Sequence, residues 1–120
     1  MPLESGFGKH LRRARLERQA TDPTFSVRRL AQRVGIEPSY LSKIERGHES
    51  PPGEDTVRRL ARELGEDSDT LLALAGKVPT DLAQIIRERP AVVAELLRSV
   101  KRVSSKRVSE ISKQIREGKW

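Results

Sequence analysis

Apolar residues recur at helical spacing through most of the chain, with charged residues between them. After residue 26, for example, Leu30, Ala31 and Val34 share one helical face, and Val57, Leu60, Ala61 and Leu64 repeat the pattern. With the usual start and stop signals, this periodicity predicts five helices at about 7–19, 27–34, 38–46, 54–64 and 68–75. We therefore expect an all-α fold.

Residues with special backbone preferences mark the ends of these segments. Ser26 and Asp67 are of the type that caps helix N-termini, and Pro38 suits a first helical position, where its missing N–H is harmless. Gly35 is expected to end a helix in the left-handed conformation. Residues 20–24 are predicted to be a loop because Pro23 resists helix formation. Within 7–19, the inward side chains are expected to be Phe7 and Leu11, with Ala14 and Leu16 as further candidates.

The character of the sequence changes after Pro79. Apolar stripes predict helices at about 81–89 and from Pro90 onward, and a thinner stripe of Val108, Ile111 and Ile115 follows. The pair Ser104-Ser105 either breaks the last helix or weakens it. We divide the chain into a helical domain, 1–78, and a helical extension, 79–120.

Composition narrows the class of protein. The chain has 120 residues, 35% of them hydrophobic and 34% charged, which suits a small aliphatic core inside a charged shell. It has no cysteine, which excludes disulfides and thiolate metal sites. No apolar run approaches the roughly 18 residues of a membrane span, and residues 1–10 lack the apolar core of a signal peptide. We expect a cytoplasmic protein without a membrane partner.

The net charge of +7 is distributed unevenly. Residues 7–46 carry ten Lys and Arg against four Asp and Glu, residues 47–75 carry three against seven, and residues 98–120 carry eight against two. A basic front, an acidic middle and a basic tail indicate oriented contact with a polyanion.

The segment 27–46 has the pattern of a helix-turn-helix motif. Two short helices meet at Gly35, and Leu41 and Ile44 would fix the second helix against the core. One polar stripe then stays exposed at spacing i, i+3, i+4, i+7: Ser39, Ser42, Lys43 and Arg46. A helix of this kind fits the major groove of DNA.

The run FSVRRLAQRVGIEPSYLSKIERG, followed by TVRRLARELG, resembles the phage-repressor family of helix-turn-helix regulators (Cro/lambda-repressor-like, xenobiotic-response-element) over about residues 7–76. The resemblance implies a five-helix lambda-repressor-like DNA-binding domain, usually dimeric, whose third helix reads an operator in double-stranded DNA. It thus implies a sequence-specific transcriptional regulator acting as a repressor.

The resemblance also assigns roles to particular residues. The positions that match the family's base-contacting residues are Pro38, Ser39, Ser42 and Lys43. The positions that match its contacts to the DNA backbone are Ser26, Val27, Arg28, Tyr40, Arg46 and His48. Arg15 and Glu45 match a structural ion pair that braces the first helix against the third. The base-facing set lacks Gln, Asn and Arg, so we expect few specific base contacts and a larger contribution from recognition of DNA shape. The link at 20–24 is also longer than is usual for the family.

Other functions remain to be weighed against DNA binding. The two histidines, His10 and His48, have no partner motif for metal or nucleophile chemistry, so we expect no enzyme, no metal and no cofactor. The extension is compatible with homodimerisation, with packing on the first domain, with contact to a membrane surface, or with binding a different protein as the tail of an antitoxin does. A further alternative is an interaction module that keeps the fold without binding DNA.

Overall fold

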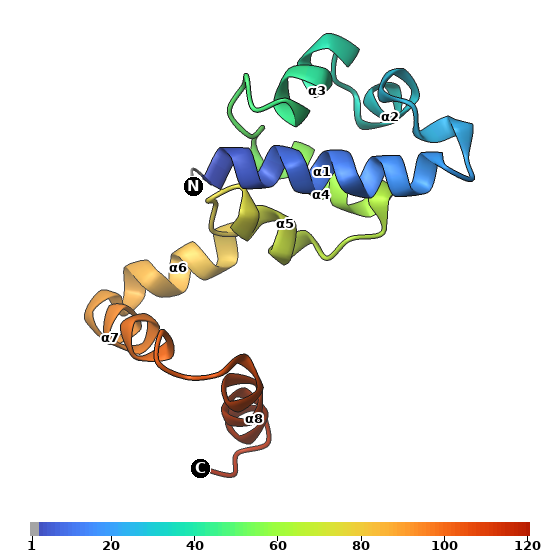
Figure 1. The fold of residues 1–120 in the computed structure, drawn as a ribbon. Helices are drawn as coiled ribbons and strands as arrows, with labels where there is room; N and C mark the ends of the chain where they lie inside the picture. The colour runs from blue at the N-terminus through green and yellow to red at the C-terminus, as the bar shows by residue number, and fades with distance from the viewer. Residues whose placement is uncertain (1–2) are drawn as a thin grey trace. The chain divides into compact units, whose positions relative to one another are not determined.

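The computed structural model describes residues 3–120, and each regular element in that range is a helix (Figure 1). The elements are α1 (Leu3–Gln19), the 3-10 helix η1 (Pro23–Phe25), α2 (Val27–Val34), α3 (Pro38–Glu45), α4 (Glu54–Leu64), α5 (Ser68–Leu74), α6 (Thr80–Glu88), α7 (Pro90–Val100) and α8 (Ser105–Arg116). The predicted all-α class is confirmed. Residues 1 and 2, which begin the predicted domain 1–78, lie outside the described residues.

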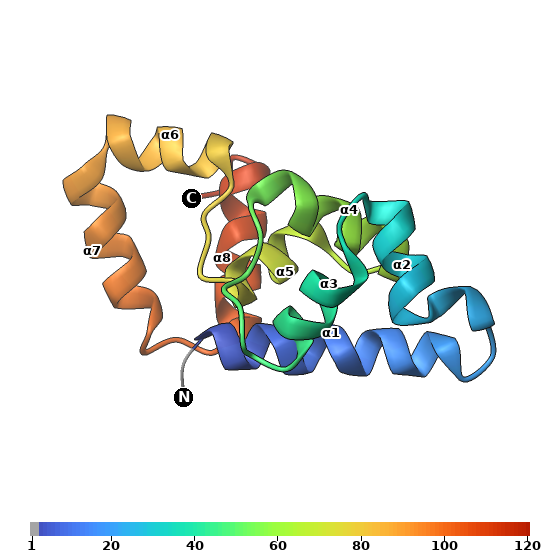
Figure 2. The same ribbon diagram turned by 90° about the horizontal axis from the view of Figure 1, so that it is seen from above.

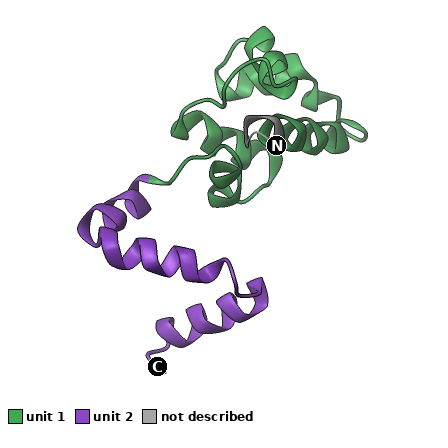
Figure 3. Ribbon diagram, turned by 60° about the vertical axis from the view of Figure 1, so that its left-hand side comes forward, with its two compact units in different colours: residues 1–79 green, residues 80–120 purple. Residues whose placement is uncertain are grey.

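The chain divides into two units, residues 1–79 and residues 80–120, which Figure 3 draws in different colours. Helices α1 to α5 belong to the first unit and α6 to α8 to the second.

Several helix ends lie where capping chemistry predicts them. The Ser26 side chain accepts a hydrogen bond from the backbone N–H of Arg29 at the start of α2, and Gly35 ends that helix with φ = 85°. Asp67 caps α5 by accepting from the backbone N–H and the hydroxyl of Thr70. The pKa of Asp67 is lowered because both bonds favour its ionised form, and the bond from the Thr70 backbone N–H has the larger effect.

Helix α1 differs from the prediction in two respects. It begins at Leu3 rather than near residue 7, so Gly6 and Gly8 lie inside the helix. The expectation that Leu16 points inward is wrong, because its exposed fraction is 44%. The reason is helical geometry: Phe7, Leu11 and Arg15 follow one another at i, i+4, i+8 and face inward. Leu16 lies about 100° around the helix from Arg15, and further still from Phe7 and Leu11.

The predicted loop at 20–24 is also partly structured. Asp22 accepts hydrogen bonds from the hydroxyl and the backbone N–H of Thr24, and this turn starts η1 at Pro23. The extra residues deliver Phe25 into the core, where the guanidinium groups of Arg18 and Arg33 lie 5.5 and 4.8 Å from the centre of its ring. Proline did not prevent a helical turn because it occupies the first position of one.

The core of the first unit is aliphatic with two phenylalanines. Helix α1 packs against α3, α4, α5 and η1, and α2 packs against α3 and α4. In Figure 1, α1 runs between α3 on one side and α5 on the other. The buried apolar residues are Phe7, Leu11, Phe25, Leu30, Ala31, Val34, Leu41, Ile44, Val57, Leu60, Ala61, Leu64, Leu71 and Leu72. The predicted inward faces of residues 27–34 and 54–64 are all among them.

The second unit has a different character. Helix α6 packs against α7. The helix is interrupted between α7 and α8, and the Ser104 side chain caps α8 by accepting a hydrogen bond from the backbone N–H of Arg107. In α6, α7 and α8 no residue is buried, and the exposed fractions of Leu96 and Leu97 on α7 are 59% and 58%. Within residues 3–120, no helix combines the length and the apolar content that crossing a bilayer requires.

Gly8 marks the closest approach between α1 and α3. A Cβ atom added at Gly8 would overlap the carbonyl oxygen of Ile44 and come within 3.1 Å of that of Glu45. A Cβ added at Gly6, two residues earlier in the same helix, would meet nothing within 4 Å. The contact between the N-terminal half of α1 and the last turn of α3 therefore requires glycine at position 8.

We expect Gly8→Ala to destabilise the first unit by about 1–3 kcal/mol, since the two helices must separate to admit the methyl group. Gly6→Ala is the matched control and should stabilise by about 0.5–1 kcal/mol, because alanine restricts the unfolded chain and favours helix. Chemical denaturation of both variants tests this. Equal effects of the two substitutions would show that the approach at Gly8 is not tight.

Candidate nucleic-acid interface

Helices α2 and α3, which lie next to each other in Figure 2, form a helix-turn-helix unit. Gly35 ends α2 and begins the turn between them. The backbone N–H groups of Gly35 and Ile36 both donate to the carbonyl of Ala31, which closes the turn. From α4, the Arg59 guanidinium donates to the carbonyl of Val34 at 3.1 Å and satisfies an acceptor that the end of α2 leaves open. The turn is thus stabilised both by its own backbone hydrogen bonds and by a side chain of α4.

Helix α3 has one buried and one exposed side. Leu41 and Ile44 are buried in the core, whereas Ser39 and Lys43 are exposed. Among the described residues, the side chains of Ser39 and Lys43 have no hydrogen-bond or ion-pair partner, so their donors are available to a ligand. Pro38 and Ser42, the other two predicted base contacts, are half-buried at the edge of the same surface.

An ion pair buried under this surface joins α1 to α3. The Arg15 Nε and Nη2 atoms donate to the Glu45 Oε2 and Oε1 atoms at 2.7 and 2.8 Å, and the two residues are only 5% and 6% exposed. The remaining Arg15 nitrogen donates to the Gln19 side chain and to the carbonyl of Phe25. The structure therefore brings together the two residues of the predicted brace, and adds η1 to the elements it connects.

The start of α2 offers mixed chemistry for a phosphate. The Ser26 hydroxyl is already engaged as the cap of the helix, and the Val27 side chain packs against the core, so Val27 can contribute only main-chain atoms. Arg28 is exposed, and within the described residues its side chain has no partner. Of the three, Arg28 presents the free cationic group.

The remaining predicted backbone contacts lie on α3 and just beyond it. Tyr40 is half-buried and packs against the core, which fixes its ring. Arg46 ends α3 and donates to the carbonyl of Ser42, and His48 is exposed in the following turn. These groups flank the surface formed by Ser39 and Lys43 on the same helix.

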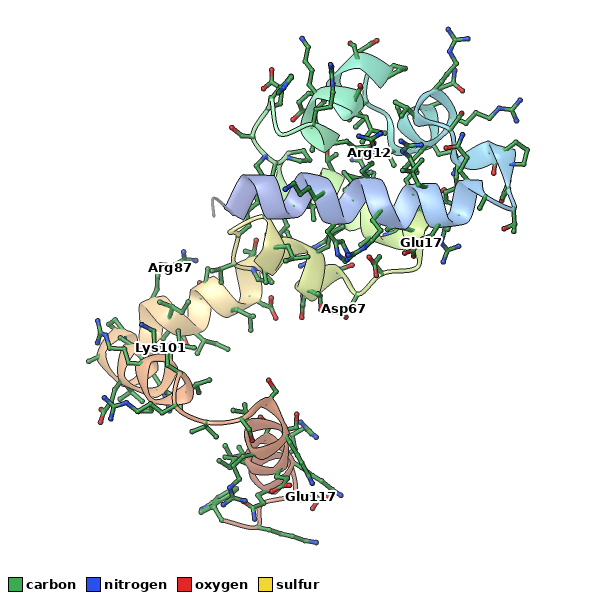
Figure 4. All side chains as sticks on the ribbon, in the orientation of Figure 1. Arg12, Glu17, Asp67, Arg87, Lys101 and Glu117 are labelled. Carbon is green, nitrogen blue, oxygen red and sulfur yellow. The ribbon has the colours of Figure 1, made fainter. Side chains whose placement is uncertain are left out.

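Two further cations were missed by the sequence analysis. Lys9 and Arg12 of α1 line an open depression of about 330 Å³ together with Glu45, Arg46, Gly47 and His48. Figure 4 labels Arg12 on the side of α1 that faces α3. The signal in the sequence is the small Gly8 directly before Lys9, but the partner segment cannot be identified without the fold. We call this feature the cationic depression.

The metal-ligating side chains of the described residues are scattered. Within residues 3–120 there is no group of three or more His, Cys, Asp or Glu side chains that could hold a metal ion. His10 contacts the Glu66 carboxylate, and this contact joins α1 to the turn before α5. His48 lies elsewhere, in the cationic depression. The histidines thus lie in two separate environments.

Comparison with known proteins covers the same part of the chain. A family model described as a helix-turn-helix domain matches residues 7–75, more than half of the chain. An uncharacterised HTH-type transcriptional regulator of Bacillus subtilis (strain 168), RghRB, is 36% identical over 74 residues, which cover 62% of this chain and 50% of the relative. The chain thus spans about half the length of that relative. No solved structure matches the chain.

We expect Arg15→Ala to lower the free energy of unfolding by about 3–5 kcal/mol, because it leaves the Glu45 carboxylate buried without a partner. Replacing both residues with methionine should cost less than the single change, since no charge remains buried. Arg58→Ala is the control, because it removes a half-exposed ion pair with Glu54 and should cost under about 1 kcal/mol. Equal losses for Arg15 and Arg58 in chemical denaturation would argue against the brace.

Proposed function

The chain belongs to the helix-turn-helix domain family, and from this premise we propose that it is a sequence-specific DNA-binding regulator of transcription. The observation that carries the proposal is the exposed side of α3, where the donors of Ser39 and Lys43 are free on a helix fixed from beneath. The similar Bacillus subtilis protein is named as an HTH-type transcriptional regulator, which supports the same function.

In the proposed complex, α3 lies in the major groove. Lys43 donates to guanine O6 or N7, and the hydroxyls of Ser39 and Ser42 pair with base edges, while Pro38 sets the entry of the helix. The groups on either side of α3 contact phosphates. On one side these are Arg28 and the backbone N–H groups at the start of α2, and on the other side they are Arg46 and His48. The Tyr40 hydroxyl is a further phosphate donor, with its ring held by the core.

The finer assignment follows the resemblance to the Cro/lambda-repressor-like, xenobiotic-response-element family. We propose that the protein acts as a repressor in the cytoplasm and binds an operator as a dimer. Two copies would place their α3 helices in successive major grooves roughly 34 Å apart, which doubles the number of base contacts. This matters because each copy offers only one strong base reader, Lys43.

The second unit supplies the surface for self-association. Its apolar side chains on α6 and α7 are exposed, and a second copy would cover them. The alternative is a different protein on the same surface, as in an antitoxin that represses its own promoter. A helix-turn-helix module that binds only protein is less well supported, because α3 exposes serine and lysine where such a module would expose apolar residues.

Selection from a pool of random duplex DNA tests the central proposal, and we expect a palindromic consensus. Lys43→Ala should then weaken binding to the selected sequence by about 1–3 kcal/mol and relax the base preference at its position. Arg62→Ala, which removes an exposed cation from α4, is the control and should change neither. An equal loss for Lys43→Ala on random DNA would make Lys43 a phosphate contact.

We expect Leu96→Asp to convert the dimer of this 120-residue chain into a monomer and to weaken binding to a palindromic site, because it places a charge in the proposed interface. Ser109→Asp adds the same charge at an exposed polar position of α8 and should leave the dimer intact. Sedimentation equilibrium measures both. A dimer that survives Leu96→Asp would move the interface elsewhere, and a monomeric wild type that binds DNA would favour a different protein partner.

A further inference from the structure

The cationic depression described above combines residues from two parts of the chain. Lys9 and Arg12 come from α1, and Arg46 and His48 come from the end of α3 and the turn after it. Gly8 permits this arrangement, since any larger residue would collide with the carbonyl of Ile44. The close contact between α1 and α3 at Gly8 therefore also places two cations of α1 beside α3.

The charges in the depression are not neutralised from within. Its carboxylate, Glu45, is fully engaged by the two hydrogen bonds from Arg15. In the described part of the chain, the side chains of Lys9, Arg12 and His48 have no hydrogen-bond or ion-pair partner, and Arg46 only donates to the carbonyl of Ser42. Like charges gathered around one open depression repel one another, and an anion placed among them relieves that repulsion.

Helix capping does not explain why these cations gather there. Cations are favoured at the C-terminal end of a helix because its last carbonyls lack partners. At the end of α3, however, the carbonyls of Ser42, Lys43 and Ile44 already accept from the backbone N–H groups of Arg46, His48 and Gly47. The side chains of Lys9 and Arg12 are thus left for a ligand from outside.

The position and chemistry of the depression point to one ligand. Arginine and lysine, both of which line the depression, are side chains that commonly bind phosphate oxygens. Arg46 is one turn beyond Lys43 on α3, so an anion in the depression adjoins whatever α3 contacts. We propose that Lys9 and Arg12, with Arg46 and His48, bind a backbone phosphate of the DNA next to the groove that α3 occupies. This inference rests on the proposed function, and it makes α1 a third element of the DNA interface.

The salt dependence of DNA binding by the 120-residue chain tests the proposal. Lys9→Gln and Arg12→Gln should each make the slope of log K against log salt concentration shallower. The double variant should lose up to about 0.9, the contribution of one neutralised phosphate. K should fall by the same factor on a selected sequence and on random duplex DNA, because phosphates carry no sequence information. Lys9→Arg keeps the charge and should keep the slope.

The charge-matched control is the double variant Arg13→Gln/Arg62→Gln. Arg13 is the next residue of α1 and does not line the depression, and Arg62 lies on α4. Both side chains are exposed, as are those of Lys9 and Arg12, so none of the variants should lower the melting temperature. If the two double variants have equal slopes while the wild type binds DNA, the inference is overturned and the proposed function stands.

Two further outcomes separate the remaining possibilities. A wild type that binds no duplex DNA at any salt concentration overturns the proposed function and this inference together. Titration with inorganic phosphate is the second arm. If Lys9→Gln/Arg12→Gln loses phosphate binding and keeps the wild-type slope on DNA, the depression binds a free anion and the assignment to the DNA backbone is wrong.

Discussion

The buried pair of Arg15 and Glu45 is the interaction on which the first unit depends. Arg15 uses its guanidinium group to hold three segments at once: Glu45 at the end of α3, the carbonyl of Phe25 in η1, and Gln19 on its own helix. Burying two charges costs several kcal/mol per ion, and the cost is offset only when the geometry and the extra hydrogen bonds are favourable. The bidentate contact and the additional acceptors meet that requirement here.

The brace also decides what α3 can expose. Because Glu45 is held from below and Leu41 and Ile44 lie in the core, the rotation of α3 about its axis is fixed. Ser39 and Lys43 then face outward, and no side-chain hydrogen bond or ion pair within the described residues holds them there. The rigidity of the proposed reading surface thus comes from residues that do not contact the ligand, which is what preorganised recognition requires.

Local chemistry explains which parts of this fold the sequence can predict. The bounds of α2 and α4 follow from Ser26, Gly35 and Gly65, whose preferences act within a few residues of the chain. The exposure of Leu16 does not follow, since it depends on which face of α1 the rest of the unit covers. The helical turn at Pro23, in contrast, is local, because the Asp22 side chain starts it by accepting from Thr24. The family resemblance supplied the Arg15 and Glu45 pair, but not its bond to Phe25.

The candidate site divides in the same way. Ser39 and Lys43 share one stripe of one helix, so periodicity alone places them together. Lys9 and Arg12 lie more than thirty residues from Arg46, and only the contact at Gly8 brings them to it. Sequence periodicity cannot report a contact between two helices whose spacing is set by a missing side chain.

The balance between specific and non-specific contacts follows from these surfaces. If α3 reads DNA as proposed, Lys43 is its one strong reader, and serine hydroxyls discriminate poorly among bases. The cations around it, on α1, at the start of α2 and after α3, outnumber the base readers and act on any sequence. One copy would therefore bind DNA with substantial affinity and little preference. Selectivity must then be gained by pairing two copies on a palindrome, or from the shape of the DNA between the half-sites. The exposed apolar surface of the second unit is the part of the chain suited to the first of these solutions.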